Sequence, residues 1–151
     1  NQLCENNEAE MFVTVWMGIL DLSTGVMTAA NAGHEYPAFR KADGEFELIK
    51  DKHGFVLAGL EDVAYTDYEI RFEPGDTLYV YTDGVAEATN AESKLFGTER
   101  MLQALNGSPD KACRKILENV SGGIHAFVQE APQFDDITMV ALTYYGETGE
   151  H

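Results

Sequence analysis

The sequence has 151 residues, enough for one domain with a sizeable hydrophobic core. Its 10 basic and 26 acidic residues give a formal net charge of −16, and no cluster of Lys or Arg interrupts the acidic residues. A nucleic acid is therefore not expected as a partner, because contacts with phosphates require a basic surface. The charge is compatible with a site that attracts divalent cations, although an ordinary solvated acidic surface accounts for most of it.

Cysteine content and hydropathy indicate a cytoplasmic protein. Cys4 and Cys113 lie far apart and match no zinc-binding spacing, so we interpret them as free thiols in a reducing compartment. The longest apolar stretch, 11–20, is too short to span a bilayer. No signal peptide is recognisable, and the opening Asn1 suggests a piece of a longer protein.

Apolar runs bounded by turn residues predict about seven strands. In chain order they span 11–21, 26–30, 37–41, 46–49, 65–72, 78–83 and 137–145. The first is expected to be a long central strand, apolar on both faces, that forms a hairpin with the second. Glu73-Pro74-Gly75-Asp76 fits a type II turn between the fifth and sixth strands.

Helices are expected late in the chain. Residues 99–106 predict a short helix capped by Thr98, and Ser108-Pro109 begins a second one, which Ser121-Gly122-Gly123 should interrupt. Strands followed by clustered helices and one final strand indicate an α+β protein built mostly on antiparallel sheet.

The most informative stretch is the apolar run that stops at Asp83-Gly84. A carboxylate at the end of a buried strand is rigidly held, which suits a metal or phosphate site, although a turn or N-cap aspartate is the simpler alternative. Asp135 and Asp136 precede the last strand, so antiparallel pairing of the two strands would bring these carboxylates together. Such a group would attract Mg²⁺ or Mn²⁺, whereas an acidic turn is the alternative interpretation.

His34 and Glu87 are two further candidates for functional residues. His34 could be a general acid or a metal ligand, but a neutral histidine that holds the corner 31–34 by hydrogen bonds is favoured. Glu87 is interpreted as a residue that caps or braces the loop after Asp83, not as a ligand.

Six short motifs occur in an order that resembles a known family. They are Met11-Phe12-Val13-Thr14, Leu20-Asp21 with Thr24-Gly25, Asn31-Ala32-Gly33-His34, Thr82-Asp83-Gly84 with Glu87-Ala88, Phe96-Gly97, and Asp135-Asp136-Ile137-Thr138. Together they resemble the carboxyl-terminal part of the bacterial metal-dependent serine/threonine phosphatases of the SpoIIE and RsbU type, relatives of the PP2C phosphatases. Any one motif is weak, but all of them in this order are specific.

The resemblance implies an α+β fold, a PP2C-like sandwich of antiparallel β-sheets flanked by helices and lacking its amino-terminal part. Residues 1–151 would form one partial domain, with 1–10 as the end of a preceding helix and 146–151 as a polar tail. At one end of the sandwich, a binuclear Mn²⁺ or Mg²⁺ site would activate a water molecule. Asp83 and Asp135 take the positions of catalytic, metal-ligating aspartates, and Gly84 and Asp136 take positions that line the site.

Partners also follow from the resemblance. The substrate would be a phosphoserine or phosphothreonine protein, typically an anti-anti-sigma factor, so the role would be signal transduction in sigma factor regulation. An upstream sensor domain would control the activity. The location would be the cytoplasm, or the cytoplasmic side of a membrane-anchored sensor protein.

One departure from the family pattern affects the expected activity. The family has an upstream Gly-Asp motif, followed by Gly-x-Gly, whose aspartate bridges the two metals, and no such motif precedes Met11. We therefore expect poor metal binding and little phosphatase activity from this chain alone. An exposed sheet edge near 11–20 should also favour a homodimer. Two alternatives stay open: a catalytically incomplete phosphoprotein-binding or regulatory module, and a small acidic β-rich domain whose aspartates are turns.

Overall fold

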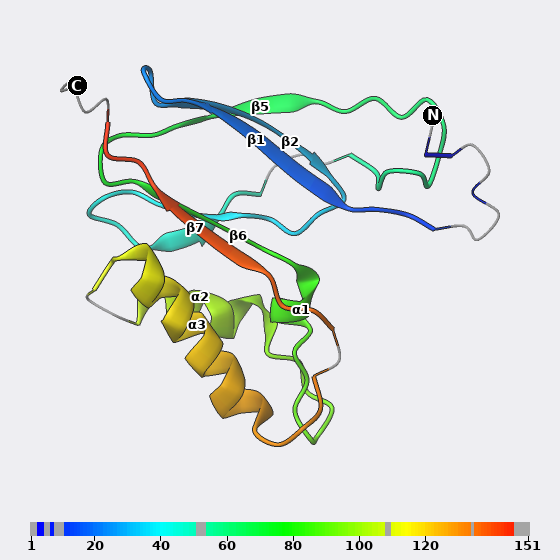
Figure 1. Ribbon diagram of the computed structural model, residues 1–151, viewed down its shortest axis with the longest axis vertical. Helices are drawn as coiled ribbons and strands as arrows, with labels where there is room; N and C mark the ends of the chain where they lie inside the picture. The colour runs from blue at the N-terminus through cyan, green and yellow to red at the C-terminus, as the bar shows by residue number, and fades with distance from the viewer. Residues whose placement is uncertain are drawn as a thin grey trace.

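The computed structural model describes residues 3–4, 7, 11–50, 54–107, 110–133 and 135–146. These residues form seven strands and three helices (Figure 1). In chain order they are β1 (Val15–Asp21), β2 (Val26–Ala32), β3 (Ala38–Arg40), β4 (Phe46–Leu48), β5 (Asp67–Arg71), β6 (Thr77–Tyr81), α1 (Asp83–Ala86), α2 (Gly97–Asn106), α3 (Cys113–Val128) and β7 (Met139–Thr143).

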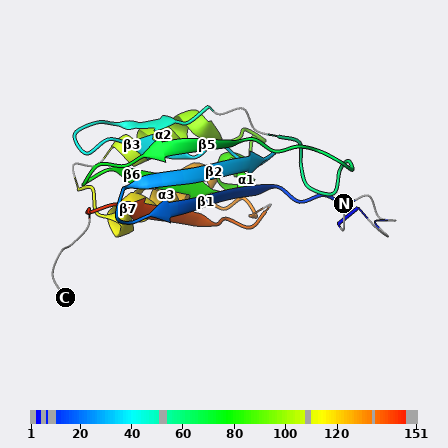
Figure 2. The ribbon, with the colours of Figure 1, turned by 90° about the horizontal axis from the view of Figure 1, so that it is seen from above.

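The strands form two antiparallel sheets that lie face to face. The first sheet has the order β1-β2-β5 and the second the order β4-β3-β6-β7. Figure 2 shows β5, β2 and β1 side by side in front of the second sheet. Helices α2 and α3 cover the opposite face of the second sheet (Figure 1), so the described chain has three layers. The expected α+β fold with mostly antiparallel sheet is confirmed.

Two hydrophobic clusters hold the three layers together. One lies between the sheets and includes Met27, Ile70 and Phe72. The other lies between the second sheet and the helices, and its fully buried side chains include Tyr79 and Met101. Strand β6 separates the two clusters and pairs with β3 on one side and β7 on the other. Its apolar, β-branched and aromatic residues therefore suit a central strand, buried on both faces.

Strand β1 is an edge strand, so the prediction of a long central strand is wrong. In the described part of the first sheet, β1 pairs with only one regular strand, β2. Trp16 and Leu20 pack against the inner cluster, while Met17 and Ile19 point outward and are 59% and 70% exposed. Apolar residues therefore occupy both faces although only one is buried. The predicted exposed edge near 11–20 is confirmed.

Most of the other predicted elements are confirmed, with shorter bounds. The β1–β2 and β3–β4 hairpins form as expected. In the turn before β6, Gly75 has a φ of +97° and the Asp76 amide donates to the Glu73 carbonyl at 2.9 Å, as a type II turn requires. Cys4 and Cys113 are free thiols.

The helices differ from the sequence expectation at two points. Helix α2 begins at Gly97 and has no side-chain cap; the buried Phe96 occupies the N-cap position, so Thr98 is not the cap. Helix α3 runs unbroken through Gly122 and Gly123. Val120 and Ile124 on either side are buried in the core, and this packing outweighs the cost of about 1 kcal/mol that each glycine adds to a helix.

Three expectations fall partly outside the described residues. These are the preceding helix at 1–10, the helix start at Ser108-Pro109 and the polar tail at 146–151. Across the part of the chain that is described, no helix has the length and apolar character needed to cross a membrane.

Candidate functional site

The antiparallel pairing of β6 and β7 brings the two aspartate motifs to the same end of the second sheet. In this register Tyr81, the last residue of β6, lies opposite Met139, the first residue of β7. The pairing continues one step further, because the Thr82 amide donates to the Thr138 carbonyl at 3.0 Å. The predicted neighbourhood of the two strands is thus confirmed.

The Thr82 side chain joins the two motifs. Its hydroxyl donates to the Asp136 carbonyl oxygen at 3.1 Å and accepts a hydrogen bond from the Thr138 amide at 3.0 Å. One hydroxyl thus fixes the backbone on both sides of Ile137. Sequence reasoning treated Thr82 only as part of a motif and missed this role. A hydroxyl residue directly before the Asp-Gly pair was the available signal.

Gly84 permits close contact between the two motifs. It is buried, and a Cβ atom added there would overlap the carbonyl oxygen of Asp136. The glycine is therefore required by the approach of another backbone segment rather than by a positive φ. The expectation that Gly84 lines a catalytic site stays a prediction, and the structure shows its close approach to the Asp136 backbone.

The two aspartates assigned as ligands present exposed carboxylates. Asp83 is the first residue of α1, and one of its carboxylate oxygens accepts a hydrogen bond from the Gly84 amide at 3.0 Å. Asp135 lies in the loop before β7, where its carboxylate accepts from the Asp136 amide at 2.7 Å. Asp136 is also exposed. These are local turn contacts that orient each carboxylate from its own backbone.

The donor chemistry at this end of the sheet fits part of a hard-cation site. Carboxylate oxygens are the ligands that Mg²⁺ and Mn²⁺ prefer. Within the described residues, however, no group of three or more His, Cys, Asp or Glu side chains is arranged to hold a metal ion. The carboxylates of Asp83 and Asp135 are the right type of oxygen donor for such a cation, and a complete site would need further ligands.

The corner after β2 is tied to the end of β6. The hydroxyl of Tyr81 contacts the Glu35 carboxylate at 3.5 Å. Burial, together with the charge of Glu35, raises the pKa of Tyr81, so this phenol stays protonated and donates at neutral pH.

His34 holds the same corner, as expected. Its amide donates to the Asn31 side-chain oxygen at 2.8 Å, and the Asn31 side-chain nitrogen donates to the His34 carbonyl at 3.1 Å. The His34 ring forms a hydrogen bond of 3.0 Å with the Thr14 hydroxyl. These contacts give the histidine a structural role. Glu87 is exposed, and its backbone amide and carbonyl brace the turn after α1.

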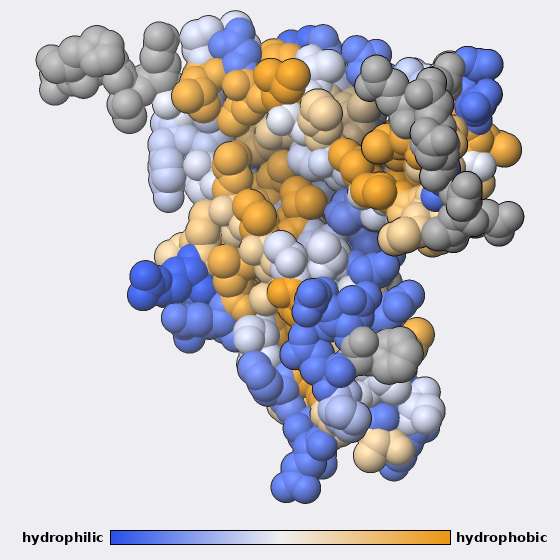
Figure 3. All heavy atoms as spheres, turned by 45° about the vertical axis from the view of Figure 1, so that its right-hand side comes forward, coloured by the Kyte–Doolittle hydropathy of each residue, from blue (hydrophilic) through white to orange (hydrophobic). Residues whose placement is uncertain are grey.

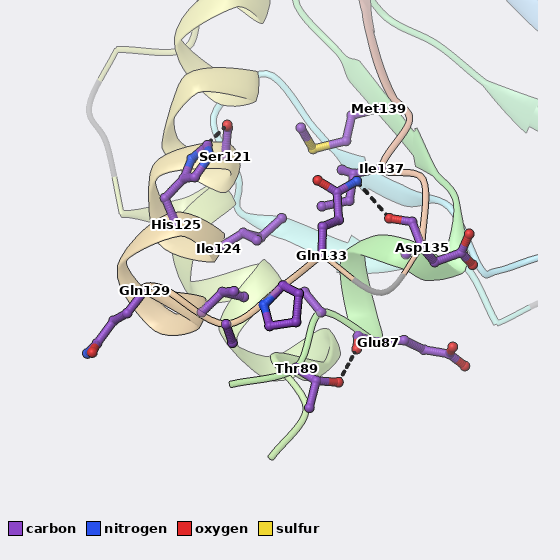
Figure 4. Close-up of a pocket in the computed structure, with 15 residues that line it drawn as sticks. Glu87, Thr89, Ser121, Ile124, His125, Gln129, Gln133, Asp135, Ile137 and Met139 are labelled. Atoms are coloured by element: carbon purple, nitrogen blue, oxygen red, sulfur yellow. Dashed lines mark hydrogen bonds between the residues drawn. The ribbon is translucent and has the colours of Figure 1, made fainter. Parts of the chain in front are cut away.

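A cavity of about 360 Å³ lies beside Asp135, between α3 and the loop that leads into β7 (Figure 4). Sequence reasoning missed this pocket because it expected α3 to break at Gly122-Gly123. The residues that line it include Gly84, Glu87, Ser121, Ile124, His125, Val128, Ala131, Gln133, Asp135, Ile137 and Met139. In Figure 4 the carboxylates of Glu87 and Asp135 point away from α3, toward the same side.

The paired sheets, the covering helices and the meeting of the two aspartate motifs define a PP2C-type phosphatase fold. The phosphatase domain of SpoIIE from Bacillus subtilis, soaked with Mn, superposes with a TM-score of 0.69 at 14% identity, covering 91% of this chain and 59% of that one. The SiaA-PP2C domain of Pseudomonas aeruginosa gives a TM-score of 0.66 at 20% identity, covering 85% of this chain and 50% of that one.

The sequence comparisons identify the family. Residues 1–145 match the family described as Stage II sporulation protein E (SpoIIE), and the chain belongs to that family. It is 30% identical over 138 residues to Protein IcfG of Synechocystis, and 26% identical over 145 residues to the phosphoserine phosphatase RsbU of Bacillus subtilis. These alignments cover 91% and 94% of this chain but only 22% and 42% of the two relatives.

Proposed function

We propose that this chain is part of a metal-dependent protein serine/threonine phosphatase that hydrolyses phosphoserine or phosphothreonine on a regulatory protein. The observation that carries the proposal is the β6–β7 register, which brings Asp83 and Asp135 to one end of a sheet in a member of the SpoIIE family. A relative, RsbU, is named a phosphoserine phosphatase, which supports the same chemistry here.

Four residues at this end of the sheet have proposed roles in the reaction. Asp83 and Asp135 each supply a carboxylate ligand to Mn²⁺ or Mg²⁺ in the complete domain. Gly84 lets the two segments approach, and Asp136 lines the site while its carbonyl is held by Thr82. When bound, the metal ions supply Lewis acidity and lower the pKa of a coordinated water.

The chain by itself is proposed to be nearly inactive. The described residues contain two suitable carboxylates but no group of three metal-ligating side chains. An additional aspartate from a Gly-Asp motif would supply a further carboxylate ligand to the metal ions. The proposed substrate is a phosphorylated protein of the anti-anti-sigma type, and an attached sensor domain is the proposed regulator. The proposed location is the cytoplasm or the cytoplasmic side of a sensor protein.

A second candidate function is a phosphoprotein-binding or regulatory module without catalysis. The incomplete ligand set favours this function for the isolated chain. Both candidates predict a folded domain, but only the first predicts hydrolysis when the missing aspartate is supplied.

The deciding experiment is hydrolysis of p-nitrophenyl phosphate with and without Mn²⁺. It compares this chain with a longer version that carries the Gly-Asp motif upstream. Activity only in the longer version with Mn²⁺ is expected. Activity of the short chain would contradict the assigned ligand set. If both proteins are folded and neither hydrolyses the substrate, the binding module is favoured.

The ligand assignment has its own test. In the longer version, Asp83→Asn and Asp135→Asn should each lower activity by more than about 100-fold. Each should also reduce the rise in melting temperature that Mn²⁺ produces, because a ligand that binds only the folded state stabilises it. Asp62→Asn, on an exposed turn, is the matched control and should change neither quantity.

A further inference from the structure

The cavity beside Asp135 has an apolar floor and a polar rim. Ile124 of α3 lies across the cavity from Ile137, in the loop before β7, and from Met139, the first residue of β7 (Figure 4). Val128 of α3 also lines the cavity. Ser121, His125 and Gln133 contribute polar atoms around it (Figure 4). Its volume of about 360 Å³ lies at the lower end of the range for ligand pockets, and a few polar groups around an apolar floor are typical of such sites.

The position of the cavity links it to the proposed reaction. Gly84 and Asp135 line the cavity and also belong to the meeting point of the two aspartate motifs. A protein substrate whose phosphorylated residue lies at Asp83 and Asp135 must extend its chain across the adjoining surface. An extended chain advances about 3.3 Å per residue, so side chains within a few residues of the phosphorylated one can reach the cavity.

The charge around the cavity indicates which peptide fits. Glu87 lies on the rim with its carboxylate exposed, and the whole chain has a net charge of −16. A basic residue next to the inserted side chain would be attracted to this surface, whereas an acidic residue would be repelled.

We propose that this cavity is a specificity pocket that takes an aliphatic side chain, flanked by Lys or Arg, near the phosphorylated residue of the protein substrate. The proposal rests on the proposed phosphatase function and adds a recognition element to it. Burial of a leucine side chain in the pocket, compared with alanine, should raise kcat/KM by about 10-fold or more.

Phosphoserine peptides provide the kinetic test. The longer, Mn²⁺-supplied protein is assayed with peptides that carry one leucine at successive positions from four residues before to four residues after the phosphoserine, with lysine beside it and glycine and serine elsewhere. We expect one or two positions to give the increase in kcat/KM, and replacement of lysine by glutamate to reduce it, less so at high salt. Equal rates at all positions would overturn the proposal.

Two matched variants connect the preference to the pocket. Ala131→Trp fills the cavity and should reduce the leucine-to-alanine ratio of kcat/KM to less than about 2-fold. Ala126→Trp adds the same side chain to an exposed position on α3, outside the lining residues, and should keep the ratio. A ratio that survives Ala131→Trp would contradict the assignment.

Methyl NMR of the 151-residue chain tests binding without catalysis. The unphosphorylated leucine peptide should shift the methyl signals of Ile124, Val128 and Ile137, and the alanine peptide should not. The methyl signal of Leu142, on the far part of β7, serves as the reference. Shifts elsewhere, or none, would overturn the pocket. Pocket shifts in this chain, together with no p-nitrophenyl phosphate hydrolysis by the longer, Mn²⁺-supplied protein, would overturn the phosphatase function alone.

Discussion

Thr82 and Asp136, which lie 54 residues apart in the sequence, are joined by a hydrogen bond of 3.1 Å from the threonine hydroxyl to the aspartate carbonyl. The same hydroxyl accepts from the Thr138 amide at 3.0 Å. The segment before β7 is therefore fixed relative to Asp83 by one side chain as well as by the strand ladder. Any loss of this link should separate the two proposed ligands.

Replacement of Thr82 by valine tests this link. Valine keeps the shape but loses both hydrogen bonds, so we expect a loss of about 1 kcal/mol in the free energy of unfolding, since the groups stay partly hydrated. The Thr138 amide should exchange with solvent faster, as measured by hydrogen exchange. Thr82→Ser retains the hydroxyl and should restore the protection. Unchanged exchange in Thr82→Val would show that the strand ladder alone holds the segment.

Gly84 and Gly122 form a matched pair for a second prediction. An alanine Cβ at Gly84 would overlap the Asp136 carbonyl oxygen, which belongs to backbone and cannot easily move. Gly84→Ala should therefore displace the Asp135 segment and lower the activity of the longer, Mn²⁺-supplied protein by about 10-fold or more. Circular dichroism should still report a folded protein.

Gly122→Ala is the control and a prediction of its own. Gly122 lies inside α3, and apart from its chain neighbours and the adjacent helix backbone no atom of the described residues lies within 4 Å of an added Cβ, so alanine should stabilise the helix by about 0.5–1 kcal/mol. Chemical denaturation measures the change, and activity should stay the same. If Gly84→Ala were more stable than the wild type, the crowding described at Gly84 would be wrong. If Gly122→Ala were less stable, the open space described at Gly122 would be wrong.

The fold could be predicted to a large extent because strand signals were local. Asp83 stands at the end of one β-branched and aromatic run and Asp135 just before the start of another, and the antiparallel pairing followed from one assumption about neighbouring strands. The role of β1 could not be predicted in the same way. Its outward Met17 and Ile19 are as apolar as buried residues, and composition alone cannot distinguish a covered face from an exposed one.

The site was less predictable from the sequence, because the pocket beside Asp135 depends on tertiary packing. Helix α3 continues through Gly122 and Gly123 because Val120 and Ile124 are packed in the core. Helix propensity describes only the local sequence and carries no information about this packing. That continuity places Ser121 and His125 beside the loop before β7. The pocket therefore could not be found before the structure was known.

Asp76 gives a prediction for the dependence of stability on pH. Its side chain is 1% exposed and accepts hydrogen bonds from the Lys41 ammonium and from the amides of Ala42 and Glu73, each at 2.9 Å. Burial by itself would raise its pKa, but these hydrogen bonds outweigh burial and hold the pKa below the usual value of 3.8.

The sign of the effect follows from the lowered pKa. The folded state favours the ionised carboxylate, so the stabilisation is fully present above about pH 4 and is lost as the pH falls through the folded-state pKa. Asp76→Asn should cost about 1–3 kcal/mol at pH 7, since it leaves buried donors unpaired. The difference from the wild-type free energy of unfolding should shrink below pH 4. A constant difference from pH 7 to pH 2 would contradict this role.

The outer face of β1 gives the last prediction. Met17 and Ile19 lie 59% and 70% exposed on an edge strand, and Figure 3 shows apolar residues gathered over the sheet layers, while the helical part is mostly polar. An uncovered apolar edge promotes pairing with a second copy, but the charge of −16 opposes it at low salt. We therefore expect dimerisation of the 151-residue chain to increase with ionic strength, measured by sedimentation equilibrium.

Two lysine variants test whether this dimer forms through β1. Ile19→Lys should abolish dimerisation, because a lysine on an edge strand disfavours pairing, whereas Gln103→Lys adds the same charge on α2 and should preserve it. Equal weakening by both variants would assign the effect to net charge, and a monomer at every salt concentration would contradict the edge contact.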